Sequence, residues 1–371
     1  MKKLLAITIG LLSVTVLSAR GPKVKVLEEE LLFSGKYAPQ YHASTIAEMP
    51  DGDLLVACFG GSKEGAADVA TWMIRKKKGD RFWGEQYKIM DAIRLDKDNY
   101  LGAYNPVLFQ LPDYAGGETL LFTKYGKNGS FGSCVGYIQR SNDGGYTWTE
   151  AEKLGAMADG TVGPDKNQPI MIGNRILAPS EGPNPKLGKR FMEHYEISDD
   201  FGKTWRRVDL TEHISEVKHT HQPALIQMAD GSVRAYFRTS DGCIATSRSC
   251  DNGETWSTQE ALPLRNNNTG IAVTKLQDGR YLLAYDDNDV FNPGKTNGPR
   301  WPLVLAISDD GLNWKTIKVL EPATREGFHE FSYPSMITAQ NGDVLIVYTY
   351  CGIENDYSPR GNIKFIRLRV E

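Results

Sequence analysis

The sequence predicts an all-β protein, a six-bladed β-propeller, from two kinds of internal repeat. The shorter repeat is a turn motif that combines Ser, Asp, Gly and a final Trp. Intact copies are SNDGGYTW at 141–148, SDDFGKTW at 198–205 and SCDNGETW at 249–256. A shortened copy, SDDGLNW, spans 308–314, and a degenerate copy, KKKGDRFW, ends at Trp83. Intervals of roughly fifty to sixty residues are typical of propeller blades.

The longer repeat is a hairpin of two apolar strands joined by a polar turn that often contains Gly. It occurs at 44–59, 106–124, 169–180, 223–238, 270–286 and 334–350. Six hairpins with turn motifs between them predict six blades of four strands, whereas a β-sandwich does not require six copies of one hairpin. The last blade has only the strand 362–370 after its hairpin, so we expect 23–33 to supply its fourth strand and close the ring.

The composition of the turn motif explains its conformation. The Asp and Ser side chains hydrogen-bond the backbone of a tight turn, and Gly supplies a positive φ. We expect Trp148, Trp205 and Trp256 to pack inside their own blades, far from any substrate. The motif therefore predicts the fold and says little about the chemistry.

Residues 1–19 are expected to be a secretory signal peptide, because two lysines precede the apolar run 4–17 and small residues follow it. We therefore expect a single domain over 20–371 that is periplasmic or secreted, monomeric and without a membrane anchor. The net charge of −3 and the absence of a long basic tract argue against nucleic acid as a partner. The five cysteines are widely spread and predict no disulfide framework.

Polar residues gather where the innermost strands are expected to begin. Because strand direction alternates within a blade, the starts of first strands, ends of second strands and starts of third strands share one face. The first-strand starts are His42, Asn105, Asn167, Gln168, His221, Gln222, Asn268, Thr269 and Tyr333. The other two positions add Asp68, Lys124, Glu181, Arg238, Asp286 and Arg300. So many hydrogen-bonding groups around one axis predict a pocket for a glycan.

The turn motifs resemble the Asp-box, or BNR, repeats of sialidases. The phrases at 42–72 (HASTIAEMPDGDLLVACFGGSKEGAADVATW) and 330–350 (EFSYPSMITAQNGDVLIVYTY) are particularly similar to bacterial predicted neuraminidases with BNR repeats. The resemblance covers essentially all of 20–371. It implies a sialidase-like six-bladed propeller with a glycosidase site.

The resemblance also implies roles for four residues. Tyr333, in FSYPSM, is similar to the sialidase tyrosine nucleophile, and Asp68 is similar in position to the acid/base aspartate. Arg238 and Arg300 are similar to two of the three arginines that hold the sugar carboxylate. Guanidinium suits this task because it is always charged and binds a carboxylate with two hydrogen bonds.

Two positions depart from the sialidase pattern. His42 stands where the family has the first arginine, and Gln222 stands where it has the glutamate that takes the tyrosine's proton. An amide cannot accept that proton. His42 and His221 are therefore the candidate bases, because imidazole titrates near neutral pH.

Three functions fit this ring. The leading one is an exo-acting glycoside hydrolase for terminal acidic sugars. The second is a polysaccharide lyase or unusual glycosidase for uronate-containing glycans, in which a central His and Tyr serve as base and acid. The third is a carbohydrate-binding propeller without catalysis.

We predict neither a metal nor a cofactor. His219 and His221 would share one face of an extended strand, and Asp286, Asp287 and Asp289 form a short acidic cluster. Neither group has the ligand spacing of an established zinc or calcium motif. Both are expected to be ordinary polar residues of the surface or pocket.

Overall fold

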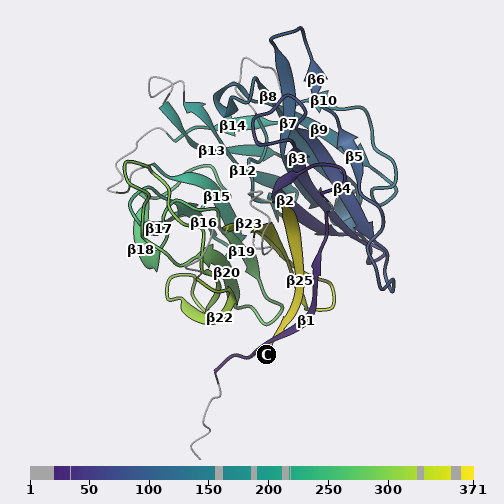
Figure 1. Ribbon diagram of the computed structural model, residues 1–371. Coiled ribbons are helices and arrows are strands. Elements are labelled where there is room, and N and C mark those ends of the chain that lie inside the picture. Colours follow the sequence, from purple (N-terminus) through teal and green to yellow (C-terminus); the bar gives the residue numbers. More distant parts are fainter. Residues whose placement is uncertain are drawn as a thin grey trace, which may run out of the picture.

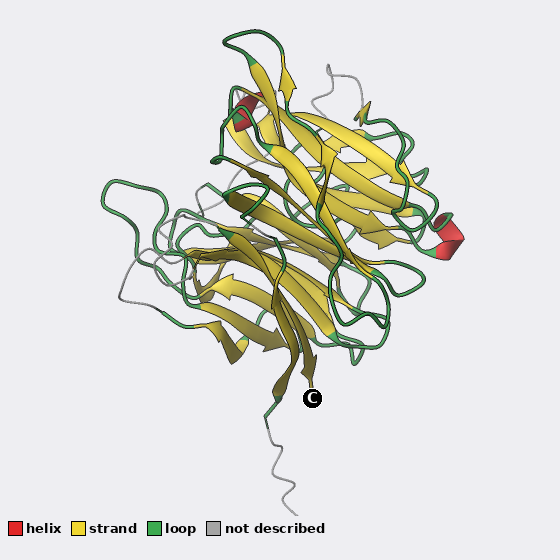
Figure 2. Cartoon of the chain, turned by 45° about the vertical axis from the view of Figure 1, so that its right-hand side comes forward, coloured by secondary structure: helices red, strands yellow, loops and turns green. Residues whose placement is uncertain are grey.

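The structure, a computed structural model, describes residues 21–33, 35–154, 162–184, 190–210, 217, 219–323, 330–351 and 361–371. The signal peptide predicted over 1–19 lies outside these residues. Within them, no helix is long and apolar enough to cross a membrane. In the described part of the chain strands dominate, and its helical segments are two single turns, η1 (Asp113–Ala115) and η2 (Phe131–Ser133) (Figure 2).

Six antiparallel sheets follow one another around a common centre and form the six blades that the hairpin repeat predicted (Figure 1). Blade one contains β2 (Gln40–Glu48), β3 (Leu54–Gly61), β4 (Ala70–Lys76) and β5 (Tyr87–Met90). Blade two contains β6 (Ile93–Arg94), β7 (Tyr100–Gln110), β8 (Thr119–Lys127), β9 (Val135–Ser141) and β10 (Glu152–Lys153). The extra strand β6 pairs with the beginning of β7 and lengthens this blade.

Blades three to five each have the predicted four strands. Blade three contains β11 (Ile170–Ile172), β12 (Arg175–Asn184), β13 (Arg190–Ser198) and β14 (Arg206–Val208). Blade four contains β15 (His221–Gln227), β16 (Val233–Arg238), β17 (Cys243–Ser249) and β18 (Glu260–Arg265). Blade five contains β19 (Ala272–Lys275), β20 (Tyr281–Asp286), β21 (Leu303–Ser308) and β22 (Lys315–Glu321).

Blade six joins the two ends of the propeller. It contains β23 (Glu330–Thr338), β24 (Val344–Cys351), β25 (Asn362–Val370) and β1 (Val24–Leu31). Strand β1 pairs antiparallel with β25 from Val24 opposite Val370 to Leu31 opposite Lys364, and the two lie side by side in Figure 1. The predicted closure of the ring by the N-terminal strand is confirmed.

The Asp-box turns have the hydrogen bonds that their composition predicted. The carboxylate of Asp200 accepts bonds from the backbone N and the hydroxyl of Thr204 at 2.8 and 2.6 Å. Asp251 and Thr255 repeat this geometry in the next blade, at 2.9 and 2.5 Å. Partial burial opposes ionisation, but the bonds from Thr204 outweigh it and lower the pKa of Asp200 to about 2.

The Asp-box tryptophans pack between blades, which corrects the prediction that each packs inside its own. Trp256 of blade four stacks on Tyr195 of blade three with ring centroids 3.9 Å apart. Trp205 of blade three meets Phe122 of blade two edge to face at 5.7 Å. The indole of Trp256 also donates to the carbonyl of Gly253 in its own turn at 3.1 Å, which holds the ring over the neighbouring blade.

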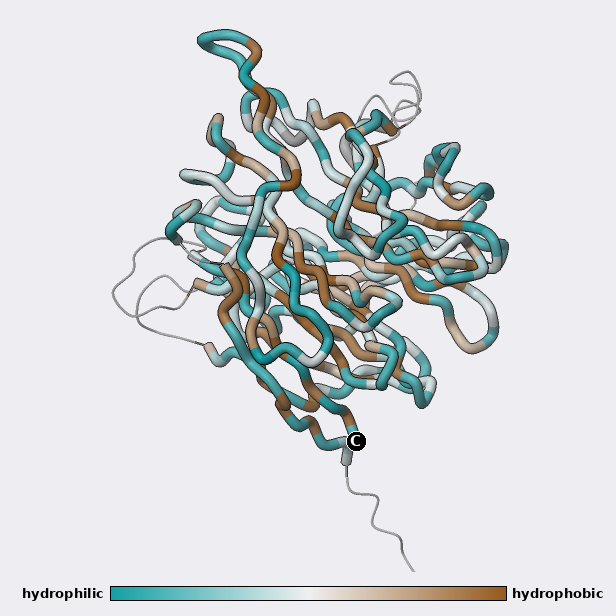
Figure 3. The backbone as a smooth tube through the Cα atoms, turned by 90° about the vertical axis from the view of Figure 1, so that its right-hand side faces the viewer, coloured by the Kyte–Doolittle hydropathy of each residue, from teal (hydrophilic) through white to brown (hydrophobic). Residues whose placement is uncertain are grey.

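The hydrophobic core follows the same plan. Apolar side chains fill the spaces between adjacent blades, so one cluster joins strands of blades one and six, and another joins strands of blades four and five. Figure 3 shows the apolar stretches along the strands and the polar stretches at the turns. Each blade therefore depends on its neighbours for burial of its faces.

Candidate functional site

The inner strands share an irregular backbone at the end where the polar ring was predicted. Strands β2, β7, β15 and β23 each contain a register shift within their first residues. At these shifts Ala43, Asn105, Gln222 and Tyr333 have positive φ values of 52°, 45°, 48° and 55°. Such bulges redirect side chains, and this backbone strain is concentrated at functional sites. Four strands thus carry the same distortion around one axis.

Tyr333 lies at the centre of this ring and is 9% exposed. The ring of His42 packs against it with centroids 4.3 Å apart. The guanidinium carbons of Arg238 and Arg300 lie 5.5 and 5.6 Å from its centroid, and the Nζ of Lys166 lies 5.9 Å from it. The structure therefore brings together Tyr333, His42 and both arginines, as the sequence predicted, and adds a lysine.

Arg300 is held in place by Glu330. Its Nη1 donates to Glu330 Oε1 at 2.7 Å and lies 3.3 Å from the hydroxyl of Ser332, which donates to the same carboxylate at 2.6 Å. His42 Nδ1 lies 2.7 Å from Thr349 Oγ1 and 3.9 Å from Glu330 Oε1. Glu330 thus fixes a cation and lies beside an imidazole, a role that sequence reasoning missed.

Asp286 lies beside Arg300 and is fully buried. Burial raises the pKa of Asp286 well above its usual range, although a bond from Thr269 and the charge of Arg300 oppose this. Burial therefore favours the protonated form of this carboxyl beside Arg300. Arg238 ends β16 opposite His221, and its Nη1 lies 3.4 Å from the carbonyl of Asn268.

A second group of charges is linked to Tyr333 through Gln222. Lys124 Nζ donates to Asp165 Oδ1 at 2.5 Å, and both side chains are buried. Gln222 Nε2 donates to Asp165 Oδ2 at 2.9 Å and lies 3.3 Å from the phenol oxygen of Tyr333. Burial lowers the pKa of Lys124, but the Asp165 charge outweighs it and the pKa is raised. The pair is therefore ionised.

His221 forms a pair with Glu181. Its Nδ1 lies 3.3 Å from Glu181 Oε2, which also accepts the backbone N of Gln222 at 3.3 Å. The His221 side chain is 24% exposed. A carboxylate at one ring nitrogen orients the imidazole and leaves the other nitrogen for proton transfer.

Asp68 lies at the rim, in the loop between β3 and β4. It is exposed, and its carboxylate accepts bonds from the backbone N and hydroxyl of Ser62. The hydroxyl of Tyr100 donates to the carbonyl of Gly65 in the same loop. Ala66, two residues before Asp68, packs in one cluster with Tyr333. The loop therefore places Asp68 beside the ring without burying it.

The segment 165–168 of blade three forms the floor of the ring. Asn167 Nδ2 donates to the carbonyls of Gln222 and Pro223 in blade four at 3.0 and 3.1 Å. Gln168 Nε2 donates to carbonyls in β2 and β7 at 2.7 and 2.8 Å. Both amides contact the main chain of other blades, whereas the prediction gave them to substrate. Asn105 is buried at its bulge in β7.

Lys166 extends this floor to the remaining blades. Its Nζ donates to the carbonyls of Ile271 and Pro334 at 2.6 Å each and to Asn167 Oδ1 at 2.9 Å. Burial and the nearby charge of Arg238 lower the pKa of Lys166 well below its usual value. Sequence reasoning missed Asp165 and Lys166, although they directly precede Asn167 in GPDKNQP. An adjacent pair of opposite charges at an expected strand start was the available signal.

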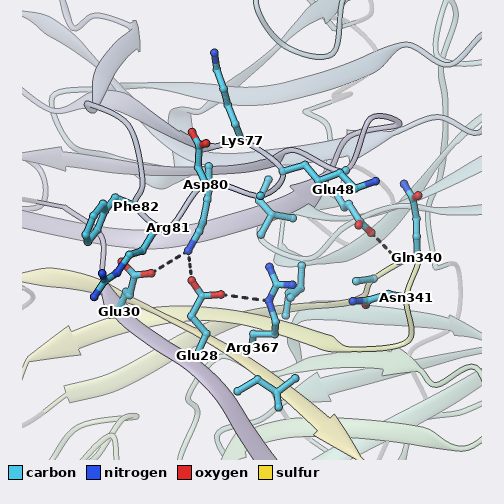
Figure 4. A pocket seen from close by; sticks show the side chains of 18 of the residues that line it. Glu28, Glu30, Glu48, Lys77, Asp80, Arg81, Phe82, Gln340, Asn341 and Arg367 are labelled. Carbon is cyan, nitrogen blue, oxygen red and sulfur yellow. Dashed lines mark hydrogen bonds and ion pairs between the residues drawn. The ribbon is translucent and has the colours of Figure 1, made fainter.

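A groove of about 940 Å³ lies elsewhere, at the hairpin-turn ends of the strands of blades one and six (Figure 4). Gly52, Gln340 and Asn341 line it at those turns. Some of its charges are paired: Arg367 Nε lies 3.3 Å from Glu28 Oε2, and Lys76 Nζ lies 3.0 Å from Glu30 Oε1. Because these turns are at the opposite strand ends from Tyr333, the groove is separate from the polar ring.

Among the described residues, no group of three or more His, Cys, Asp or Glu side chains is placed to hold a metal ion. The acidic side chains at 286–289 do not converge on one point, because other contacts hold them apart. Asp287 accepts a bond from Arg265 at 3.0 Å, while Asp286 turns into the protein interior.

Comparisons with known proteins agree with this architecture. The model of the BNR repeat-like domain matches residues 52–346. The anhydrosialidase of Macrobdella decora is 26% identical over an alignment of 236 residues, and the match covers 57% of this chain and 29% of that protein. The chain thus spans less than a third of the length of this relative.

Solved structures share the fold at low identity. A protein of unknown function from Dyadobacter fermentans is 17% identical, with a TM-score of 0.67 over 94% of this chain and 99% of that one. The NanB sialidase from Streptococcus pneumoniae is 13% identical, with a TM-score of 0.67 over 93% and 70%. The repeats, the six blades and the matched family model lead to one conclusion: this chain belongs to the BNR repeat-like domain family and is a sialidase-like β-propeller.

Proposed function

We propose that this protein is an exo-acting glycoside hydrolase that removes terminal acidic sugars from glycans. The observation that supports it most is the placement of Arg238 and Arg300, each within 5.6 Å of the ring centre of Tyr333. A sugar carboxylate bound by both guanidinium groups would hold its anomeric carbon near the phenol oxygen. The name of the anhydrosialidase relative supports the same substrate class.

In this proposal the reaction proceeds in two displacements. The oxygen of Tyr333 attacks the anomeric carbon, the bond to the leaving oxygen breaks, and Asp68 donates the proton that this oxygen needs. Water then replaces the tyrosine oxygen, and Asp68 takes a proton from that water. A neutral phenol suits attack next to a substrate carboxylate, because an anionic carboxylate nucleophile would be repelled.

The proton of Tyr333 must go to a group other than Gln222. Two imidazoles are available. His42 packs on the tyrosine ring at 4.3 Å, and His221 is oriented by Glu181. Loss of the first arginine of the sialidase pattern leaves two guanidinium groups and His42 for acid recognition. Which acidic sugar is the substrate is therefore to be identified by experiment.

The His221–Glu181 pair favours one second candidate, a lyase for uronate-containing glycans. In that reaction His221 removes the proton next to the uronate carboxylate, and an arginine neutralises the carboxylate. A carbon–carbon double bond forms as the glycosidic bond breaks, and Tyr333 donates a proton to the leaving oxygen. The product absorbs ultraviolet light, unlike the product of hydrolysis.

The two functions are separated by one experiment. The protein is incubated in oxygen-labelled water with glycans that end in acidic sugars and with uronate polysaccharides, and the products are identified by mass spectrometry. Hydrolysis gives a product that contains labelled oxygen and has no new ultraviolet absorbance. Elimination gives a product that absorbs ultraviolet light and contains no labelled oxygen. Tyr333→Phe serves as the inactive control. Tight glycan binding without any product would overturn both proposals in favour of a binding propeller.

A further inference from the structure

The amide of Gln222 can face its neighbours in only one orientation. Its Nε2 lies 2.9 Å from Asp165 Oδ2 and 3.3 Å from the phenol oxygen of Tyr333. A carboxylate only accepts hydrogen bonds, so the amide nitrogen has to face Asp165. The Oε1 of Gln222 is buried and has no hydrogen-bond partner among the described residues.

Asp165 is ionised in this position. Burial opposes ionisation, but the Lys124 ammonium 2.5 Å away outweighs it, and a bond from Gln222 adds to the effect and lowers the pKa of Asp165. The Asp165 side chain is 8% exposed. A fixed, buried anion therefore holds the amide nitrogen of Gln222 toward itself and toward Tyr333.

The two hydrogens of Nε2 then have two acceptors, the Asp165 carboxylate and the Tyr333 oxygen. We propose that Asp165 is a positioning residue that sets the direction of the hydrogen bond at Tyr333: the phenol oxygen accepts on the protein side, and the phenol proton points into the pocket. This inference rests on the proposed function, because it assigns the path of the proton that the reaction at Tyr333 moves.

In this arrangement the phenol proton leaves in a different direction from that in a tyrosine–glutamate pair. A glutamate would take the phenol proton on the protein side, whereas here an N–H donor stabilises the oxygen after its proton has left toward the pocket. The proton then passes to an imidazole, that of His42 or His221. The charged or titratable groups that face this unit are His42, Lys124, Lys166, Glu181, His221, Arg238, Arg300 and Glu330.

The test replaces the anion without leaving a buried charge. Asp165→Asn alone would leave the Lys124 ammonium unpaired, so the main variant is Asp165→Asn combined with Lys124→Gln. The new amide at 165 can donate to Gln222 Oε1 as well as accept from Gln222 Nε2. The Gln222 amide is then no longer held in a single orientation. We expect kcat on an acidic glycoside to fall about a hundredfold, with KM changed less than about twofold, because both side chains are buried and pair with each other.

The matched control is Asp53→Asn, which removes another buried carboxylate that is paired with a cation, here Arg75, at the far strand ends. It should lower stability and leave kcat and its pH profile unchanged. A purely structural role of Asp165 would make the two variants behave alike. Equal kcat in the double variant and the wild type would overturn the inference.

A second readout does not depend on turnover. The near-ultraviolet absorbance of the Tyr333 phenolate is obtained by subtracting Tyr333→Phe spectra in the wild-type and double-variant backgrounds. Loss of the N–H donor should move this signal about one pH unit higher, the equivalent of one hydrogen bond. An unmoved signal would overturn the inference even if glycan turnover supports the proposed function. A moved signal in a protein that cleaves no glycan would support it while the function fails.

Discussion

Nζ of Lys166 lies 2.6 Å from the carbonyl oxygen of Pro334, the residue that follows Tyr333. The same nitrogen donates to Ile271 in blade five. Tyr333 has a φ of 55°, a conformation that costs roughly 1–3 kcal/mol for a residue with a side chain. The bonds from Lys166 therefore tie this strained position to blades three and five, and the neighbouring blades keep it in place.

We predict that Lys166→Met lowers both stability and turnover. Methionine keeps most of the aliphatic stem but leaves the carbonyls of Ile271 and Pro334 without their donor, at a cost of about 1–3 kcal/mol for each buried acceptor. The backbone at Tyr333 can then relax, so kcat should fall. Chemical denaturation and steady-state kinetics measure the two effects.

Lys364→Met is the control for that experiment. Lys364 Nζ donates to Glu321 at 2.5 Å and joins β25, the third strand of blade six, to β22 of blade five. This variant should lose stability and keep kcat. Wild-type kcat in a folded Lys166→Met protein would show that the floor does not position Tyr333.

Contacts between blades give a prediction for stability. Trp256→Ala removes the stacking on Tyr195 across blades three and four and should lower the free energy of unfolding by about 3 kcal/mol. Phe82→Ala is the control, because Phe82 is 67% exposed and its loss should change stability by less than about 0.5 kcal/mol. Equal stability of the two variants would contradict a role of Trp256 in joining blades.

The fold could be predicted because the same local sequence signals recur from blade to blade. The Asp, Gly and Trp of each Asp-box and the alternation of each hairpin are local signals, and the last blade reveals its missing strand by being short. The partner of Trp256 was not predictable, because the repeat is periodic and does not say whether an indole packs on its own blade or on the preceding one.

The ring around Tyr333 could be predicted in outline for a similar reason. Asn105, Gln222 and Tyr333 occupy equivalent positions of repeated hairpins, and His42 lies one residue earlier in its own hairpin, so strand direction alone puts them on one face. Asp165, Lys166 and Glu330 are not repeated in other blades. Their roles depend on side chains that reach across the axis to other blades, and sequence periodicity carries no information about that reach.

The Asp-boxes should make stability depend on pH in the acid range. The pKa of Asp200 is lowered from 3.8 to about 2 in the folded protein. A lowered pKa means that its contribution is present above pH 3.8 and is lost as the pH falls toward about 2. Asp200→Asn should therefore flatten the dependence of Tm on pH in this window. An unchanged slope would contradict the assignment.

Acid recognition is tested by changing arginine to lysine, which keeps the charge but loses the two-pronged hydrogen bonding. We expect Arg238→Lys and Arg300→Lys each to raise KM for an acidic glycoside about tenfold, the effect of losing one charge-assisted hydrogen bond. The larger effect is expected at 300, where Glu330 and Ser332 also fix the guanidinium.

Arg206→Lys is the matched control for both arginine variants. Arg206 is exposed on the outer strand of blade three and pairs with Glu254. Its replacement should leave KM unchanged. Unchanged KM in all three variants, or a preference for neutral sugars, would remove the carboxylate from the proposed recognition.

The proton donor to the leaving group gives the last prediction. Asp68 is exposed at the rim and held by Ser62, so it can reach the leaving oxygen of a bound glycoside. Asp68→Asn should depress kcat on a natural glycan by about 10²- to 10⁴-fold, the usual contribution of a general acid. A substrate with a strongly acidic leaving group needs no proton, so the same variant should cleave it at close to the wild-type rate. Tyr333→Phe should stay slow on both substrates, because the nucleophile is missing in either case. If Asp68→Asn is fully active on natural glycans while His221→Ala is inactive, the proton donor is not Asp68 and the elimination reaction becomes the better account.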